Sequence, residues 1–229
     1  VKQANSVMKM GLIFDLDGVL VDSAAFHFKA WQRMAESLGI AFDLEANEQL
    51  KGLSRARSMD KILSWGGLSM TGEDKARHMA EKNANYLDLV AQLTTKDTLP
   101  GAENYLREAR RLGHPIALGS ASKNAGFILE KVGLMDCFDA IVDGNVVTTS
   151  KQDPEVFLTA AKLLNRAPED CVVFEDAVAG LEAAQRGGMK TIGIGDPSAL
   201  YADKVVPDLA ALGSVSDSLL AFNFNGQDL

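Results

Sequence analysis

Short apolar runs alternate along the chain with segments whose apolar residues recur every three or four positions. Each run is followed by turn-forming or polar residues, which is typical of strands buried on both faces. The runs are 10–14, 115–119, 171–174 and 191–195, with a weaker one at 140–143. The clearest helical segments between them are 125–134, 153–165 and 179–188.

This alternation predicts an α/β fold built on a parallel sheet. Successive parallel strands need crossover connections, and these are right-handed and place helices on both faces of the sheet. We therefore expect a three-layer, Rossmann-like core.

One region departs from the alternation. Residues 24–92 contain no convincing strand but several helical stretches, such as 26–39, where apolar residues recur every four positions. We expect a discontinuous catalytic core of residues 1–22 and 93–229. We also expect a helical cap domain of residues 23–92, inserted after the first strand and lying over the carboxyl edge of the sheet.

Composition and charge exclude several classes of protein. The net charge of -8 argues against a nucleic-acid partner, which would need a basic face. No apolar stretch reaches the ~18 residues of a membrane span, and the first ten residues, a ragged start, lack a secretory signal. The only two cysteines, Cys137 and Cys171, lie beside apolar residues, which favours a reducing compartment, the cytoplasm.

Polar residues with complementary chemistry follow four of the predicted strands. In an open parallel sheet, the loops that leave the carboxyl ends of the strands lie along one edge, where ligands bind. These loops bring together Asp15 and Asp17, the segment 120–124, Lys151, and the pair Glu175 and Asp176.

Several ionised carboxylates that lie close together repel each other unless protons or a cation neutralise them. A hard dication with oxygen ligands meets this need. Magnesium combines a few carboxylates with water and phosphate oxygens, so the cluster predicts one Mg²⁺ per chain and phosphoryl chemistry.

The residue types suggest separate roles in phosphoryl transfer. Asp15, nearest the strand, is the expected nucleophile, and Asp17 the expected acid and base. Ser120 can donate its hydroxyl to the phosphoryl group, beside the backbone amides of 122–124, which favour an anion. Lys151 can neutralise charge that develops during transfer. Each residue alone would also suit a helix cap, a turn or a solvated surface.

Four motifs in order resemble those of the haloacid dehalogenase superfamily. They are FDLDGVLVDS (14–23), SAS (120–122), Lys151 and EDAVAG (175–180). Further stretches resemble the beta-phosphoglucomutase branch of that superfamily, over roughly residues 10–210. They are FHFKAWQRMAESLGI (26–40), NEQLKGLSRARSMDKIL (47–63), EKNANY (81–86) and ALGSASKNAGFILEKVGL (117–134).

The resemblance implies a reaction and a metal site. That branch interconverts beta-glucose 1-phosphate and glucose 6-phosphate through an aspartyl-phosphate and beta-glucose 1,6-bisphosphate, which is both intermediate and activator. It implies Asp15 as the nucleophile and Asp17 as the acid and base. Magnesium is then held by Asp15, the backbone carbonyl of Asp17 and Asp176, with Glu175 supporting the metal shell.

The resemblance also implies roles for residues outside the four motifs. His27 and Lys82 correspond to insert residues that link substrate binding to closure and acid/base positioning. Arg55 corresponds to the group that binds the distal phosphate, and Lys51 and Gly52 precede it in the same binding stretch. The remaining residues correspond to groups that bind the reactive-side phosphate and the sugar: Ser122, Lys123 and Asn124.

One position departs from the family pattern. The family commonly has proline directly after the catalytic lysine, whereas this chain has Gln152 there and keeps Pro154. Proline fixes φ and weakens the preference for a trans peptide. Without this proline, the family pattern does not predict the backbone conformation around Lys151. The lysine keeps its assigned role.

Three functions remain as alternatives at this point. A mutase must exclude water and hold a bisphosphate in two orientations, which Arg55 and a closing lid favour. A magnesium-dependent sugar-phosphate phosphatase shares the first half reaction and differs in admitting water. A phospho-accepting receiver domain is a distant third, because receivers lack the second aspartate and the helical insert. We expect a monomer that acts on a small sugar phosphate.

Overall fold

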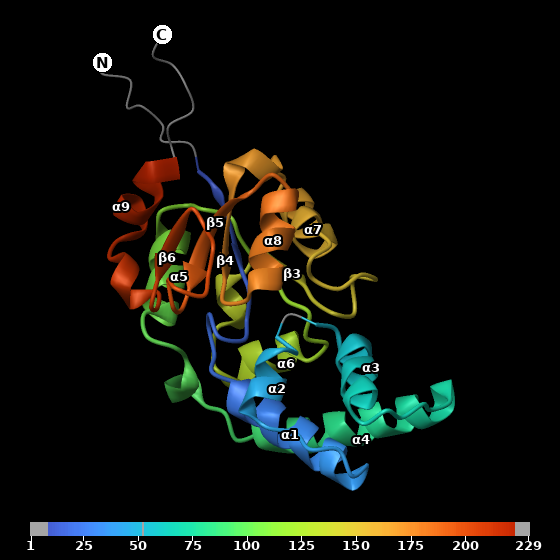
Figure 1. Ribbon diagram of the computed structural model, residues 1–229. Helices are drawn as coiled ribbons and strands as arrows, with labels where there is room; N and C mark the ends of the chain where they lie inside the picture. Colours follow the sequence, from blue (N-terminus) through green and yellow to red (C-terminus); the bar gives the residue numbers. More distant parts are fainter. Residues whose placement is uncertain (1–8, 52, 223–229) are drawn as a thin grey trace, which may run out of the picture.

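The computed structural model describes residues 9–51 and 53–222. Its centre is a parallel sheet with the strand order β3-β2-β1-β4-β5-β6 (Figure 1). The strands are β1 (Gly11–Phe14), β2 (Ile116–Gly119), β3 (Ala140–Val142), β4 (Cys171–Glu175), β5 (Lys190–Ile194) and β6 (Lys204–Val206). The predictions for residues 1–8 and for Gly52 lie outside the described residues.

Strand β1 lies in the middle of the sheet and pairs in parallel with β2 and β4. Its last residue, Phe14, is in register with Leu118 of β2 and Phe174 of β4. The three strands therefore end nearly level, and the loops that follow them start side by side. This register brings the predicted catalytic segments to one edge of the sheet.

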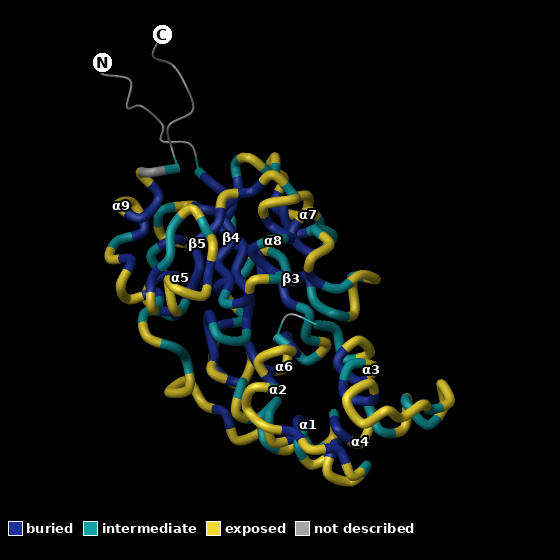
Figure 2. The backbone as a smooth tube through the Cα atoms, in the orientation of Figure 1, coloured by how far each residue is buried: buried dark blue, intermediate teal, exposed yellow. Residues whose placement is uncertain are grey.

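Helices cover both faces of the sheet, because successive strand residues point to opposite sides. Leu12 and Phe14 pack in one apolar cluster with α5 (Ala102–Arg111), α6 (Ala125–Lys131) and α9 (Val215–Leu219). Ile13 and Val173 pack in another cluster with α7 (Glu155–Leu163) and α8 (Val178–Arg186). Figure 2 shows the strands as a buried layer. The prediction of a three-layer α/β core is confirmed.

Four helices lie beyond the carboxyl end of the sheet (Figure 1). They are α1 (Ala24–Ser37), α2 (Leu44–Glu48), α3 (Arg55–Trp65) and α4 (Gly72–Val90). Trp31, Met59 and Ile62 form an apolar cluster of their own there. Tyr86 and Val90 instead join the cluster that covers the sheet. The helices therefore have a separate core yet remain packed on the sheet, and the proposed domain boundaries stay a prediction.

The sequence did not predict β6, which is only three residues long and has polar flanks. Its position depends on pairing: the Gly195 amide donates to the Val206 carbonyl at 2.8 Å, and the Asp203 carboxylate accepts from the Thr191 amide at 2.7 Å. Within 9–51 and 53–222, no helix combines the length and hydropathy needed to cross a membrane.

Candidate active site

The centre of the site is a buried ammonium between two buried carboxylates. Lys151 Nζ lies 2.5 Å from Asp15 Oδ1 and 2.7 Å from Glu175 Oε2. Asp15 directly follows β1 and Glu175 ends β4, while Lys151 reaches them from the loop after β3. The other oxygen of Glu175 accepts from the Ala177 amide at 3.0 Å. The structure thus brings together the predicted catalytic residues Asp15 and Lys151 and the predicted metal-site residue Glu175.

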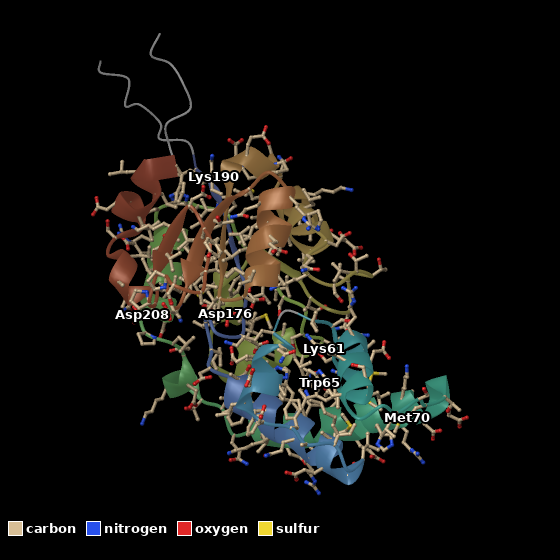
Figure 3. All side chains as sticks on the ribbon, viewed as in Figure 1. Lys61, Trp65, Met70, Asp176, Lys190 and Asp208 are labelled. Carbon is tan, nitrogen blue, oxygen red and sulfur yellow. The ribbon has the colours of Figure 1, made fainter. Side chains whose placement is uncertain are left out.

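Asp176 completes an acidic cluster at the end of the sheet that faces α1–α4 (Figure 3). Asp15, Glu175 and Asp176 each offer an oxygen, and these oxygens lie within 4.8 Å of one another. Lys51 Nζ lies 3.4 Å from Asp176 Oδ2 and 3.0 Å from Glu48 Oε2, at the rim. An all-oxygen donor set of this kind fits a hard dication such as Mg²⁺.

The charges at this centre do not balance. Burial raises the pKa of Asp15 to about 6 and that of Glu175 to about 8, although the Lys151 ammonium opposes both rises. Burial alone would lower the pKa of Lys151, but the two carboxylates outweigh it and keep the ammonium charged. With all three carboxylates ionised, the cluster would carry two more negative charges than the Lys151 ammonium offsets. Burial and this repulsion raise the pKa values of Asp15 and Glu175, and a dication would compensate the charge.

The glycine in the first motif has a specific structural role. Gly18 has a φ of +80°, where residues with a Cβ are strained. A Cβ at this position would also collide with the Asp176 carboxylate. Glycine at position 18 therefore lets the loop that carries Asp15 and Asp17 pack directly against the acidic end of β4.

Asp17 faces the helical insert rather than the acidic cluster. The Ser23 hydroxyl donates to Asp17 Oδ1, and His27 Nε2 lies 3.8 Å from Asp17 Oδ2. Burial raises the pKa of Asp17, but the His27 and Ser23 contacts outweigh it and hold the pKa below its ordinary value. Asp17 is therefore ionised near neutral pH in this arrangement, ready to accept a proton.

His27 is held in turn by a buried lysine. Lys82 Nζ lies 3.2 Å from His27 Nδ1, and because an ammonium only donates, the ring proton belongs on Nε2, toward Asp17. The Lys82 ammonium also lies 4.5 Å from the ring centre of Trp31 and 4.7 Å from that of Tyr86. Burial and the Lys82 charge lower the pKa of His27, so the imidazole is neutral. The predicted pair His27 and Lys82 thus forms a chain that ends at Asp17.

A second group of polar residues converges around Asn83 of α4. The Arg55 guanidinium donates to Asn83 Oδ1 at 2.7 Å, and the Asn124 side-chain amide donates to the same oxygen at 2.8 Å. Arg55 is half-buried, and burial lowers its pKa. The sequence predicted Arg55 and Asn124 but missed Asn83. Asn83 lies in EKNANY (81–86), one of the stretches that resemble the beta-phosphoglucomutase branch, and this resemblance is the signal in the sequence that points to it.

Ser120 and the residues after it form a tight turn. The buried Ser120 hydroxyl accepts from the Ser122 amide at 3.1 Å, and the Ser122 hydroxyl accepts from the Asn124 amide at 3.2 Å. The Ser120 proton remains available for a ligand, whereas two of the amides predicted to face an anion already have partners. The Lys123 side chain is exposed, and its carbonyl accepts from Asn145 at 3.0 Å.

The residue after the lysine adopts a backbone conformation that proline cannot reach. Gln152 has a φ of +84°, and its amide donates to the Ala179 carbonyl at 3.2 Å. Its carbonyl accepts from Arg186 at 3.3 Å, and its side chain donates to Glu182 at 3.3 Å. All three partners belong to α8, which begins just after the acidic cluster. The departure noted in the sequence therefore corresponds to a distinct local structure.

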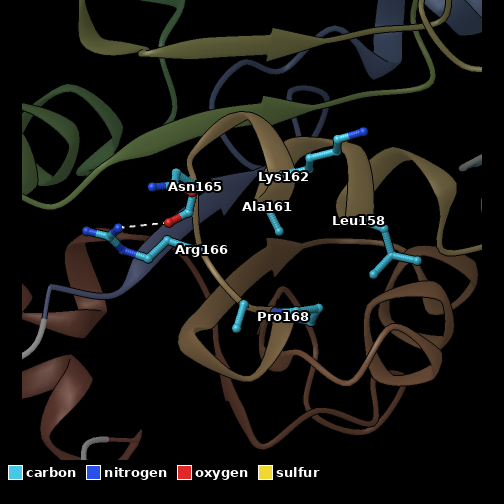
Figure 4. Close-up of a pocket in the computed structure, with 7 residues that line it drawn as sticks. Leu158, Ala161, Lys162, Asn165, Arg166 and Pro168 are labelled. Carbon is cyan, nitrogen blue, oxygen red and sulfur yellow. Dashed lines mark hydrogen bonds between the residues drawn. The ribbon is translucent and has the colours of Figure 1, made fainter.

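A pocket of about 470 Å³ lies elsewhere on the molecule (Figure 4). It is lined by the end of α7 and the following turn, including Leu158, Lys162 and Pro168. This turn leads into the amino end of β4, whereas the acidic cluster lies at the carboxyl end. The pocket is therefore separate from the site.

Comparisons with known proteins agree with this geometry. A family model described as haloacid dehalogenase-like hydrolase matches residues 9–188. The chain is 42% identical over 198 residues to beta-phosphoglucomutase of Bacillus subtilis, covering 85% of this chain and 88% of that protein. It is 32% identical over 187 residues to the fructose-1-phosphate phosphatase YqaB of Escherichia coli, covering 80% and 95%.

A solved structure also supports this family assignment. The crystal structure of beta-phosphoglucomutase from Clostridium difficile superposes with a TM-score of 0.87 at 41% identity, covering 90% of this chain and 93% of that one. The family match removes the receiver-domain alternative and confirms the resemblance seen in the four motifs. The chain belongs to the haloacid dehalogenase-like hydrolase family and is an enzyme of that family.

Proposed function

We propose that this enzyme interconverts beta-glucose 1-phosphate and glucose 6-phosphate, in the manner of a beta-phosphoglucomutase. The observation that carries the proposal is that Asp17 contacts the insert through His27 and Lys82, while Asp15 contacts the sheet through Lys151. The proton-transfer group is thus tied to the helices expected to close over a sugar. Sequence identities of 41–42% to proteins of that name support this choice.

In the proposed reaction the enzyme starts with a phosphoryl group on Asp15. The sugar 6-hydroxyl of beta-glucose 1-phosphate attacks the phosphorus, its proton passes to Asp17, and the bond between phosphorus and Asp15 breaks. The product of this half is beta-glucose 1,6-bisphosphate, which then binds in the opposite orientation. Asp15 attacks the phosphorus at C1, and Asp17 returns its proton to the departing C1 oxygen.

The buried groups around Asp15 support this transfer electrostatically. Lys151 lies within hydrogen-bonding distance of Asp15 and is placed to neutralise charge on the transferring phosphoryl oxygens. Asp15, the Asp17 carbonyl and Asp176, supported by Glu175, would hold Mg²⁺. When bound, that ion neutralises the carboxylates and polarises the phosphoryl group. The Ser120 hydroxyl supplies a further donor.

The insert would decide between sugar and water as the acceptor. We propose residues 23–92 as a cap that closes over the site and excludes water, with Arg55 binding the distal phosphate of the bisphosphate. The family resemblance assigns Asn124 to the reactive side and the sugar, but we assign it to the distal phosphate beside Arg55, because both side chains donate to Asn83 Oδ1. Ser122 and Lys123 would bind the phosphate on the reactive side. Lys51 would bind substrate at the rim of the site, near Asp176. A monomer in the cytoplasm stays a prediction.

A phosphatase of sugar phosphates is the second candidate. The 32% identity to a fructose-1-phosphate phosphatase favours it, because the two reactions share the attack by Asp15. A coupled assay for glucose 6-phosphate, run with Mg²⁺ and trace bisphosphate beside an inorganic-phosphate assay, separates the two. We expect glucose 6-phosphate to form far faster than free phosphate, and the reverse ranking would assign the enzyme as a phosphatase.

A further inference from the structure

Asn83 lies between two groups that the proposed function assigns to phosphate binding. Arg55 begins α3 and Asn124 directly precedes α6, so the two donors come from the insert and from the sheet region respectively. Both donate to Asn83 Oδ1, at 2.7 Å and 2.8 Å. Because a guanidinium only donates, the atom that faces it must be the amide oxygen.

The point where these donors meet suits an oxygen of an anion. The Arg55 guanidinium is half-buried and, among the residues described, forms no ion pair with a carboxylate; its hydrogen-bond partner is the neutral amide of Asn83. A partly desolvated guanidinium gains most from a phosphate, which can accept two parallel hydrogen bonds. The neutral oxygen of Asn83 is a weaker competitor than a carboxylate would be.

We propose that Asn83 is a positioning residue that stands in for one oxygen of the distal phosphate. Its carbonyl oxygen keeps Arg55 and Asn124 directed at one point in the free enzyme and leaves that point when the phosphate binds. The phosphate then links Arg55, at the start of α3, directly to Asn124, at the start of α6, without Asn83 between them. Asparagine at this position preorganises the donors without a charge that would repel the ligand.

This inference rests on the proposed assignment of Arg55 to a distal phosphate, and Asn83→Asp tests it. A carboxylate of the same size would pair with Arg55 and compete with phosphate. KM for beta-glucose 1-phosphate should rise about tenfold while kcat changes little, since a charge-assisted bond is about twice as strong as a neutral one. Hydrolysis of acetyl phosphate, which carries no second phosphate, should be unaffected. An unchanged KM for the sugar phosphate would overturn the proposal.

The chain offers a matched control on the same helix. Asn85 accepts from Arg33 at 3.2 Å on an exposed face, so Asn85→Asp makes the same substitution beside an arginine that has no part in the proposed site. It should leave KM unchanged. The Asn83→Asp effect should also disappear in an Arg55→Gln background, and persistence there would contradict the role of Arg55. If the enzyme proves to release free phosphate, the proposed function fails, but the KM comparison still decides the role of Asn83.

Discussion

The charged form of the Lys82 side chain is less stable in the folded protein than in the unfolded chain. Its side chain is 3% exposed and faces His27 and two aromatic rings, with no carboxylate within ion-pair distance among the described residues. Burial, and then the Arg55 charge, lowers its pKa from 10.5 to about 7. The unfolded chain therefore binds this proton more tightly than the folded chain does.

The pH dependence of stability follows from this difference. Between about pH 7 and pH 10.5 the unfolded state holds more protons, so the free energy of unfolding rises with pH. At about 1.4 kcal/mol per pH unit for one full proton, and with Lys82 already half-deprotonated at pH 7, the rise from pH 7 to pH 9 is about 2 kcal/mol. Lys82→Met keeps the volume and removes the charge, so it should abolish this rise.

Urea denaturation at pH 7, 8 and 9 measures the effect directly. Contributions from other groups cancel when the variant is compared with the wild type. The variant should also be the more stable of the two at pH 7 and yet lose turnover, because His27 loses its donor. Lys75→Met is the matched control, since Lys75 lies on the same helix and pairs with Asp60 at 2.6 Å. An equal rise in the wild type and in Lys82→Met would show that the Lys82 charge does not cause it.

Substitutions at three further positions test other parts of the site. Asp17→Asn should lower kcat by about 10²–10⁴-fold with unchanged circular dichroism, because the proton acceptor is lost; near-normal turnover would remove its acid/base role. Gly18→Ala should lower turnover and weaken Mg²⁺ binding measured by calorimetry, since its Cβ collides with Asp176; wild-type affinity would contradict that packing. Gln152→Gly should keep turnover in the coupled assay, whereas Gln152→Pro should lose it, because proline cannot reach a φ of +84° or donate to Ala179. Equal activity of these two variants would show that the backbone at 152 is unimportant.

The three-layer arrangement of helices and sheet could be predicted, because it depends on patterns of apolar residues within short segments. Apolar runs mark buried strands, and the crossover rule fixes which end of each strand carries the loops of the site. β6 could not be predicted, since Lys204–Val206 is a strand only through its pairing with β5. Three residues are too few to show the alternation of apolar and polar positions that marks a strand.

The same division applies to the site. The meeting of Asp15, Lys151 and Glu175 followed from strand ends and family motifs, and the structure brings them within hydrogen-bonding distance. Asn83 could not be predicted from local sequence, because it is one polar residue among several on α4. Its contacts depend on how α4 lies relative to Arg55 of α3 and to Asn124, the residue before α6. The conformation of Gln152 depends similarly on its bonds to α8.

The proposed mutase activity requires the phosphoryl group to return to a sugar rather than to water. Phosphorus NMR of one reaction, started from beta-glucose 1-phosphate with Mg²⁺ and trace bisphosphate, follows every phosphorus species at once. We expect the starting signal to be replaced by that of glucose 6-phosphate, with inorganic phosphate appearing far more slowly. Accumulation of inorganic phosphate at the expense of glucose 6-phosphate would show that water is the acceptor and that the enzyme is a phosphatase.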